Sequence, residues 1–203
     1  MVGIPIAQLI HQSIKKGERT MILIKKILVP VDLSDFSVCA VGYASCLAKQ
    51  TQAEILALHV LNVDVLKPNL AGTYSDQFTV GAEGPIAPRA TDSENIIESK
   101  QRIVQAFLDQ KLSSELRSAV KLHPLARLGK VADEIIACAK EQNCDLIVMM
   151  SQAGTLRRLF GGSIAERVIR HATCPVLSLS ASAHVRTEKD EILELGSIER
   201  WAA

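Results

Sequence analysis

The sequence predicts an α/β fold, a single domain built on a five-stranded, parallel, doubly wound sheet. Two observations carry this prediction. Short apolar runs, typical of strands covered on both faces, alternate along the chain with segments whose apolar residues recur at helical spacing. The chain of 203 residues is also long enough for one sizeable core but short for two full domains. The alternation implies right-handed β-α-β crossovers and therefore a parallel sheet with helices on both faces.

The five expected strands are apolar runs bounded by polar residues. The first, Ile-Leu-Val-Pro-Val, is uninterrupted. The third contains Pro124, which cannot donate a ladder hydrogen bond, so this strand is expected at an edge of the sheet. The expected strands span residues 27–31, 54–60, 120–128, 145–149 and 175–179.

The segments between these strands are expected to be helical. Ser34 is a suitable N-cap for the first helix, and Gly129 provides the turn into the third. The second helix keeps its apolar spacing despite polar interruptions. The four expected helices span residues 34–50, 93–116, the segment that follows Gly129, and 164–172.

Three segments lie outside this alternation. Residues 1–23 form an N-terminal extension that allows a short amphipathic helix, and a domain that begins at Met21 after an upstream start codon is the alternative. Residues 62–91, within the domain spanning 24–180, are rich in Pro and Gly and are expected to be a long flexible connection, either functional or disordered. The polar, acidic tail 181–203 is expected to form no more than a frayed or short docked helix.

Composition and charge argue against two classes of partner. The 23 Lys and Arg against 22 Asp and Glu give a net charge of +1, and aromatic residues, which stack on single-stranded nucleic acid, are only 3% of the chain. No apolar run approaches the roughly 18–20 residues that span a bilayer.

The five cysteines lack a C-x-x-C pair and are expected to be reduced thiols. We therefore expect a cytoplasmic protein with no nucleic-acid partner, no membrane partner and no metal site.

The turn Gly161-Gly162-Ser163 before the last helix is a candidate anion site. It would direct unpaired backbone N–H groups and the positive end of the helix dipole toward the loop. Gly and Ser also cap helices that bind nothing, so both interpretations stay open. In doubly wound sheets, ligands bind beyond the carboxyl ends of the strands, where the strand order reverses. A reversal between the first and fourth strands would bring Asp32 and the loop after Met149 to one crevice.

Four motifs together resemble the universal stress protein family over roughly residues 24–180. The resemblance implies a Rossmann-like, adenine-nucleotide-hydrolase-like domain that is usually dimeric. Some members of that family hold ATP, with or without Mg²⁺, and others lack detectable ATP binding. The motifs are Lys-Lys-Ile-Leu-Val-Pro-Val-Asp-Leu-Ser at 25–34, Leu-His-Val at 58–60, Asp-Leu-Ile-Val-Met at 145–149, and Gly-Ser-Ile-Ala-Glu-Arg-Val-Ile-Arg-His-Ala-Thr-Cys-Pro-Val-Leu at 162–177.

The resemblance implies nucleotide-binding residues at both ends of the domain. Asp32 matches the aspartate that accepts a hydrogen bond from the adenine amino group, and a carboxylate suits that donor. The other matching positions line the adenine pocket or the phosphate loop. They are Pro30, Val60 and Met149 in the pocket, and Met150, Ala153, Gly162, Ser163 and Ile164 in the loop.

The phosphate loop departs from the family motif, which reads Gly, two residues, Gly, nine residues, Gly, and then Ser or Thr. Met150 and Ala153 stand at the first two glycine positions, and only eight residues separate Ala153 from Gly162. Glycine lets the backbone approach a phosphate closely, and Met150 does not. Pairing Ser151 with Gly154 is an alternative register that recovers one glycine but loses the strand anchor.

These residues leave three functions open. The first is an ATP-binding regulator of the stress response, with no catalytic residue assigned and at most slow ATP hydrolysis. The second is a homodimeric interaction module of the same fold that does not bind ATP, joined through the fifth strand, Pro175 to Leu179. The third, an enzyme of the wider nucleotide-binding α/β group, has less support, because the chain carries neither a His-x-Gly-His turn nor a Ser-Gly-Gly loop after the first strand.

Structural roles compete with functional ones at several residues. Asp32 is also suited to cap the helix that follows it. His59 lies within an apolar strand and is expected to be packed and hydrogen-bonded, not a base. Asp133 and Glu134 are expected to be helix-start charges favoured by the helix dipole, not paired catalytic carboxylates.

Overall fold

The structure, a computed structural model, describes residues 22–62, 90–151, 164–180, 184–186 and 192–194. Three expectations lie outside these described residues. They are the short N-terminal helix, the flexible character of most of the 62–91 connection, and the geometry of the phosphate loop before Ile164.

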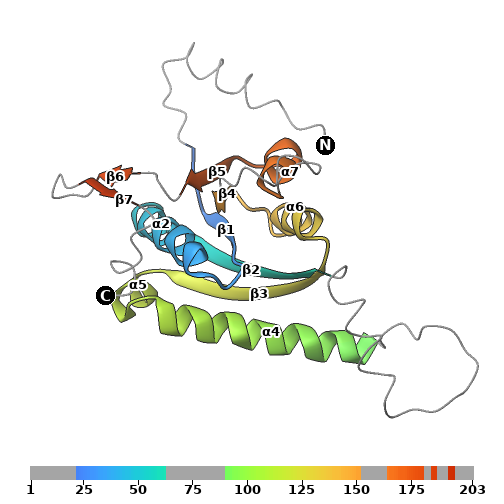
Figure 1. The fold of residues 1–203 in the computed structure, drawn as a ribbon. Helices are drawn as coiled ribbons and strands as arrows, with labels where there is room; N and C mark the ends of the chain where they lie inside the picture. Colours follow the sequence, from blue (N-terminus) through green and yellow to red (C-terminus); the bar gives the residue numbers. More distant parts are fainter. Residues whose placement is uncertain (1–21, 63–89, 152–163, 181–183, 187–191, 195–203) are drawn as a thin grey trace, which may run out of the picture.

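A single five-stranded parallel sheet forms the centre of the molecule, in the order β3-β2-β1-β4-β5 (Figure 1). This confirms the predicted fold class. Pro124 lies in β3, an edge strand, as the sequence predicts. The strands are β1 (Lys26–Pro30), β2 (Glu54–Asn62), β3 (Lys121–Gly129), β4 (Leu146–Ser151) and β5 (Val176–Ser180).

Helices cover both faces of the sheet, as expected for a doubly wound fold. Helices α2 and α4 pack on one face, while α6 and α7 pack on the other, and α4 lies along the edge strand β3 (Figure 1). The helices are α2 (Asp35–Thr51), α4 (Ala90–Lys111), α5 (Ser114–Ala119), α6 (Val131–Glu141) and α7 (Ile164–His171).

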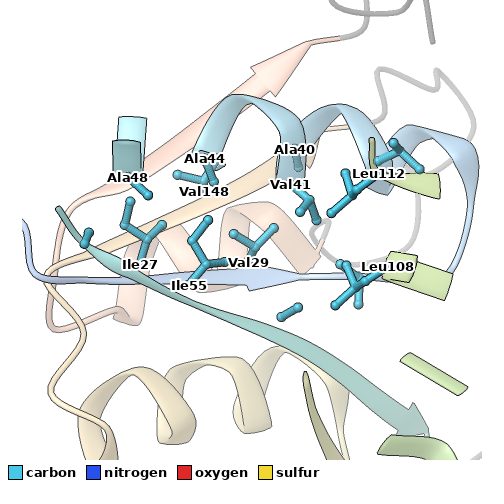
Figure 2. Close-up of a cluster of buried hydrophobic side chains, with 14 of the residues drawn as sticks. Ile27, Val29, Ala40, Val41, Ala44, Ala48, Ile55, Leu108, Leu112 and Val148 are labelled. Carbon is cyan, nitrogen blue, oxygen red and sulfur yellow. The ribbon is translucent and has the colours of Figure 1, made fainter. Parts of the chain in front are cut away.

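The face under α2 and α4 holds the larger of two hydrophobic clusters, here called the α2/α4 cluster. Small side chains of α2 point toward branched side chains of the strands, which lets the helix approach the sheet closely (Figure 2). Its central members are Ile27, Val29, Ala40, Val41, Ala44, Ala48, Ile55, Leu108, Leu112 and Val148.

The opposite face holds the α6/α7 cluster. Because side chains alternate between the two faces along a strand, residues next to members of the first cluster enter the second. Leu28, for example, lies between Ile27 and Val29 in sequence but belongs to this cluster. Its buried members are Leu28, Leu56, Leu58, Ala132, Ile135, Cys138, Ala139, Cys144, Ile147, Met149 and Val168.

The prediction of one continuous helix over residues 93–116 is wrong, because the structure has two helices there. Helix α4 ends at Lys111, and α5 begins at Ser114. The side-chain oxygen of Ser113 accepts a hydrogen bond from the backbone N–H of Leu116 at 3.3 Å, which caps α5. A serine that satisfies helix-start N–H groups favours a new helix over continuation of the old one.

The C-terminal tail, for which the sequence predicts at most a frayed or short docked helix, contains strands instead. The described part of the tail is an antiparallel pair of short strands, β6 (His184–Arg186) and β7 (Ile192–Glu194), with Val185 opposite Leu193. The β-branched Val185 and Ile192 favour strands, and a short helix is marginal in water.

Among the helices that the structure describes, none is long and apolar enough to cross a membrane.

Candidate functional site

The strand order reverses between β1 and β4, and these two strands separate before they end. Their ladder stops at Leu28 and Ile147, whereas β1 continues to Pro30 and β4 to Ser151. Each strand stays paired to its other neighbour up to its last residue. The sheet therefore opens at the carboxyl ends of β1 and β4, at the position where doubly wound folds bind ligands.

Three of the expected pocket residues lie on the same face of the sheet, beside this opening. Val60 and Met149 pack into the α6/α7 cluster. Pro30 pairs with Leu58, another member of that cluster, so its ring lies on the same face. The structure thus brings Pro30, Val60 and Met149 to the same side of three consecutive strands, close to their carboxyl ends.

Met150 points the other way. It packs against the α2/α4 cluster, on the face opposite Met149, and is paired with Leu179 in β5. The core therefore accommodates the methionine side chain where the resemblance leads one to expect glycine. A large residue at position 150 does not fill the face that carries Pro30 and Val60.

Asp32 lies in the loop after β1, with an exposed side chain. Its Oδ1 atom accepts hydrogen bonds from the backbone N–H of Ser34 at 3.0 Å, from the Ser34 hydroxyl, and from the Ser37 hydroxyl at 2.9 Å. Partial burial raises the pKa of the Asp32 carboxyl, but the hydrogen bonds from Ser34 and Ser37 outweigh it and hold the pKa below its usual value of 3.8. The side chain is therefore a carboxylate at neutral pH.

Asp32 differs from the expected helix cap, because its Oδ1 atom accepts hydrogen bonds from Ser34 and from the Ser37 hydroxyl. Ser34 is the N-cap residue of α2, as predicted, but its side chain makes no capping hydrogen bond. The bond from the Ser34 N–H to Asp32, two residues back, is instead an Asx turn. All three bonds from Ser34 and Ser37 go to Oδ1, so the local role occupies one of the two carboxylate oxygens.

The loop also contains a residue in an uncommon backbone conformation. Leu33 has φ = 65°, in the left-handed region that a leucine rarely adopts. Such a conformation persists only where the surroundings fix it, and it is enriched at ligand-binding sites. Here the Asx turn from Asp32 to Ser34 spans Leu33 and holds it.

His59 is packed and hydrogen-bonded, as the sequence predicts. Its Nδ1 atom lies 2.9 Å from the carbonyl oxygen of Val31, and the side chain is half-buried. The backbone N–H of Val31 donates to the carbonyl of Leu58 at 2.8 Å. The Leu-His-Val motif predicts that His59 lies in a strand but gives no sign that it contacts Val31, the residue before Asp32.

On the phosphate side, the described part of the site begins at Ile164, the first residue of α7, which is 39% exposed. Ala153, Gly162 and Ser163 lie outside the described residues. Helix α7 contacts β4, β5 and α6, so it lies beside β4 on the face of the α6/α7 cluster.

The acidic residues at the start of α6 are engaged in ion pairs, which agrees with their expected structural role. Asp133 pairs with Arg167 of α7 at 2.7 Å, and Glu134 pairs with Arg127 of β3 at 3.5 Å. These pairs connect α6 to its neighbours and are not a catalytic carboxylate pair. Among the described residues, no group of three or more His, Cys, Asp or Glu side chains is arranged to hold a metal ion.

Residues 23–179 match the family model described as the universal stress protein family. Universal stress protein MJ0531 of Methanocaldococcus jannaschii is 35% identical over 170 residues, which cover 83% of this chain and 88% of that protein. Universal stress protein YxiE of Bacillus subtilis is 28% identical over 76% of this chain and 98% of its own length.

Solved structures agree on the fold. Protein MJ0577, also from M. jannaschii, superposes with a TM-score of 0.55 at 21% identity, over 78% of this chain and 96% of that one. A universal stress protein solved in complex with cAMP superposes with a TM-score of 0.52 at 17% identity, over 78% of this chain and 98% of that one.

Proposed function

The chain belongs to the universal stress protein family, and from this premise we propose that it binds an adenine nucleotide, ATP in the first place, at the carboxyl ends of β1 and β4. The observation that carries the proposal is the early end of the β1–β4 ladder, with Asp32 and three apolar residues gathered at that opening. The solved relative with cAMP supports the same class of ligand. We further propose a regulatory role in the stress response and a cytoplasmic location, with at most slow hydrolysis of ATP.

The adenine ring is assigned to the face of Pro30, Val60 and Met149. Apolar side chains suit the flat faces of a purine, because they exclude water without competing for its hydrogen bonds. The Oδ2 atom of Asp32 would accept a hydrogen bond from the adenine amino group, since the bonds from Ser34 and Ser37 go to Oδ1. A guanine has a carbonyl oxygen at that place, which the carboxylate would repel.

The phosphates are assigned to the start of α7. Backbone N–H groups at a helix N-terminus bind anions, so Gly162, Ser163 and Ile164 are the proposed contacts, preceded by Met150 and Ala153 along the loop. The packing of Met150 into the opposite face supports the proposal, because the side chain does not compete for the nucleotide's volume. Any Mg²⁺ would be bound chiefly through phosphate oxygens and water.

Calorimetric titration of ATP with Mg²⁺ into the purified protein tests this function. We expect a binding isotherm with one site, which Asp32→Ala weakens by about tenfold through loss of a charged acceptor. Gly162→Val should weaken it by adding a side chain beside the phosphates. Asp109→Ala, an exposed carboxylate in α4 that pairs with Arg117, is the matched control and should bind ATP like the wild type. No heat and no thermal shift in millimolar ATP and Mg²⁺ would overturn the proposal.

A homodimer through β5 is a second proposal, favoured by the edge position of this strand. Within the described part of the chain, β5 is the last strand of the sheet beside β4, and its Val176 and Leu177 are half-buried. An edge strand that carries apolar residues suits association with a second copy. Light scattering should give a mass in solution of twice the chain mass. Ser178→Lys, which places a charge on the exposed middle of β5, should lower that mass toward the mass of one chain. Ser118→Lys on α5 is the control, and a monomeric wild type would contradict the proposal.

A further inference from the structure

His59 joins β2 to the chain just beyond the end of β1. Strand β1 ends at Pro30, yet Val31 is held to β2 at both of its backbone polar groups. Its N–H donates to the Leu58 carbonyl at 2.8 Å, and its carbonyl lies 2.9 Å from Nδ1 of His59. The side chain of His59 thus supplies a further rung where the backbone ladder has stopped.

The atom that His59 contacts belongs to the same rigid unit as the backbone N–H of Asp32. The carbonyl of Val31 and the N–H of Asp32 form one planar peptide group. A hydrogen bond that fixes the carbonyl therefore also fixes the direction in which the chain enters Asp32. On the other side of Asp32, the bond from Ser34 and the left-handed Leu33 fix the direction in which the chain leaves.

We propose that His59 is a positioning residue that sets the place of the Asp32 carboxylate and thereby the selectivity for adenine over 6-oxo purines. The assignment of a purine to this carboxylate rests on the proposed function, whereas the control of Asp32 by His59 does not. His59 itself would contact Val31 and not the nucleotide.

The chemistry of the bond determines which form of the imidazole acts. A carbonyl oxygen only accepts hydrogen bonds, so Nδ1 of His59 must carry the proton and donate. The neutral ring then has its lone pair on Nε2. A doubly protonated ring still donates from Nδ1, so the contact to Val31 survives in both charge states of the ring.

Two substitutions separate the positioning role from the bulk of the side chain. Asn places an amide N–H near the position of the imidazole Nδ1, so His59→Asn keeps a donor for the Val31 carbonyl. His59→Leu fills much of the same volume but has no donor, and it leaves that carbonyl unpaired. The thermal midpoint of both variants, compared with the wild type, reports any general loss of stability.

The first readout uses ATP and ITP, whose bases differ at position 6 by an amino group and a carbonyl oxygen. Calorimetry should give a wild type that prefers ATP, and His59→Leu should lose about tenfold in ATP affinity and most of that preference, as expected for one lost hydrogen bond to a charged group. His59→Asn should keep both. A general loss of folding would lower the affinity for ATP and ITP together and leave their ratio unchanged.

The second readout needs no nucleotide. The carboxyl pKa of Asp32, measured by NMR, should lie below 3.8 in the wild type and in His59→Asn, and should move toward 3.8 in His59→Leu as the bonds from Ser34 and Ser37 weaken. A wild type that binds neither ATP nor ITP would overturn the proposed function and the selectivity, while this titration still decides whether His59 positions Asp32. An unchanged Asp32 pKa in His59→Leu, or an unchanged ratio of ATP to ITP affinity, would overturn the inference.

Discussion

The hydroxyl of Ser37 lies 2.9 Å from Oδ1 of Asp32, and it comes from a residue that is only 4% exposed. The same hydroxyl lies 2.7 Å from the backbone carbonyl of Ser34. A buried group in the first turn of α2 thus contacts the exposed carboxylate that we assign to adenine. The helix and the binding loop are connected through this serine.

Replacement of Ser37 by alanine should destabilise the protein by about 1–2 kcal/mol, because a buried hydrogen-bonded hydroxyl is lost. Urea denaturation measures this change. Ser118→Ala is the control, since the Ser118 hydroxyl makes a similar bond to the Glu115 carbonyl on the exposed surface of α5. A midpoint for Ser37→Ala equal to that of Ser118→Ala would show that the bond to Asp32 contributes nothing.

The lowered pKa of Asp32 predicts a pH dependence with a definite sign. The folded state holds the carboxyl pKa below 3.8, so at low pH the unfolded chain binds more protons than the folded one. The stability that Asp32 contributes is therefore present above about pH 3.8 and is lost as the pH falls through the folded pKa. Asp32→Asn should be less stable than the wild type at pH 6, and the difference should shrink on acidification. A difference that grows toward low pH would contradict this.

Asp145 should be important for stability, although it lies at the opposite end of the sheet from the site. Its Oδ2 atom accepts from the backbone N–H groups of Lys25 and Lys26, at 2.8 and 3.0 Å, and so joins the start of β4 to the start of β1. Asp145→Asn should lower the free energy of unfolding by about 1.5–3 kcal/mol, the range for bonds to a charged group. ATP affinity should stay near that of the wild type, because the change lies at the amino ends of the strands. A large loss of affinity without a loss of stability would refute this assignment.

Cys144 predicts a loss of stability in alkali. Burial, with Cys138 and Cys174 nearby, raises the pKa of its thiol from 9.0 to about 12. Between these values the unfolded chain releases a proton that the folded protein keeps, so stability should fall as the pH rises from 9.0 toward about 12. The contribution of this thiol has a slope of up to about 1.4 kcal/mol per pH unit. Cys144→Ala should show a correspondingly shallower decline in guanidinium denaturation, and identical slopes would contradict the prediction.

The order of strands and helices could be predicted because each strand is a short apolar run between polar turns. The division of the second helix at Ser113 could not, because the helical spacing continues across it and a serine that caps looks the same in sequence as one on a helix surface. The antiparallel pair at Val185 and Leu193 was missed for a related reason. Short segments follow their contacts more than their own propensity.

The candidate site could be predicted only in part. Asp32, Pro30 and Val60 follow from the motifs that resemble the family, and the structure brings them to the opening between β1 and β4. The direction of Met150 could not be inferred, because it depends on which face each residue of β4 presents. The bond from His59 to the chain before Asp32 joins segments 28 residues apart and becomes visible only with the strands in register.

A crystal structure of the protein with bound ATP tests the central claim most directly. We predict that the adenine amino group lies within hydrogen-bonding distance of Oδ2 of Asp32, with the ring against Pro30, Val60 and Met149 and the phosphates at the start of α7. Crystals of Asp32→Ala grown in the same conditions should show markedly lower occupancy. A nucleotide bound elsewhere, or an opening between β1 and β4 that stays without nucleotide at millimolar ATP, would contradict the account.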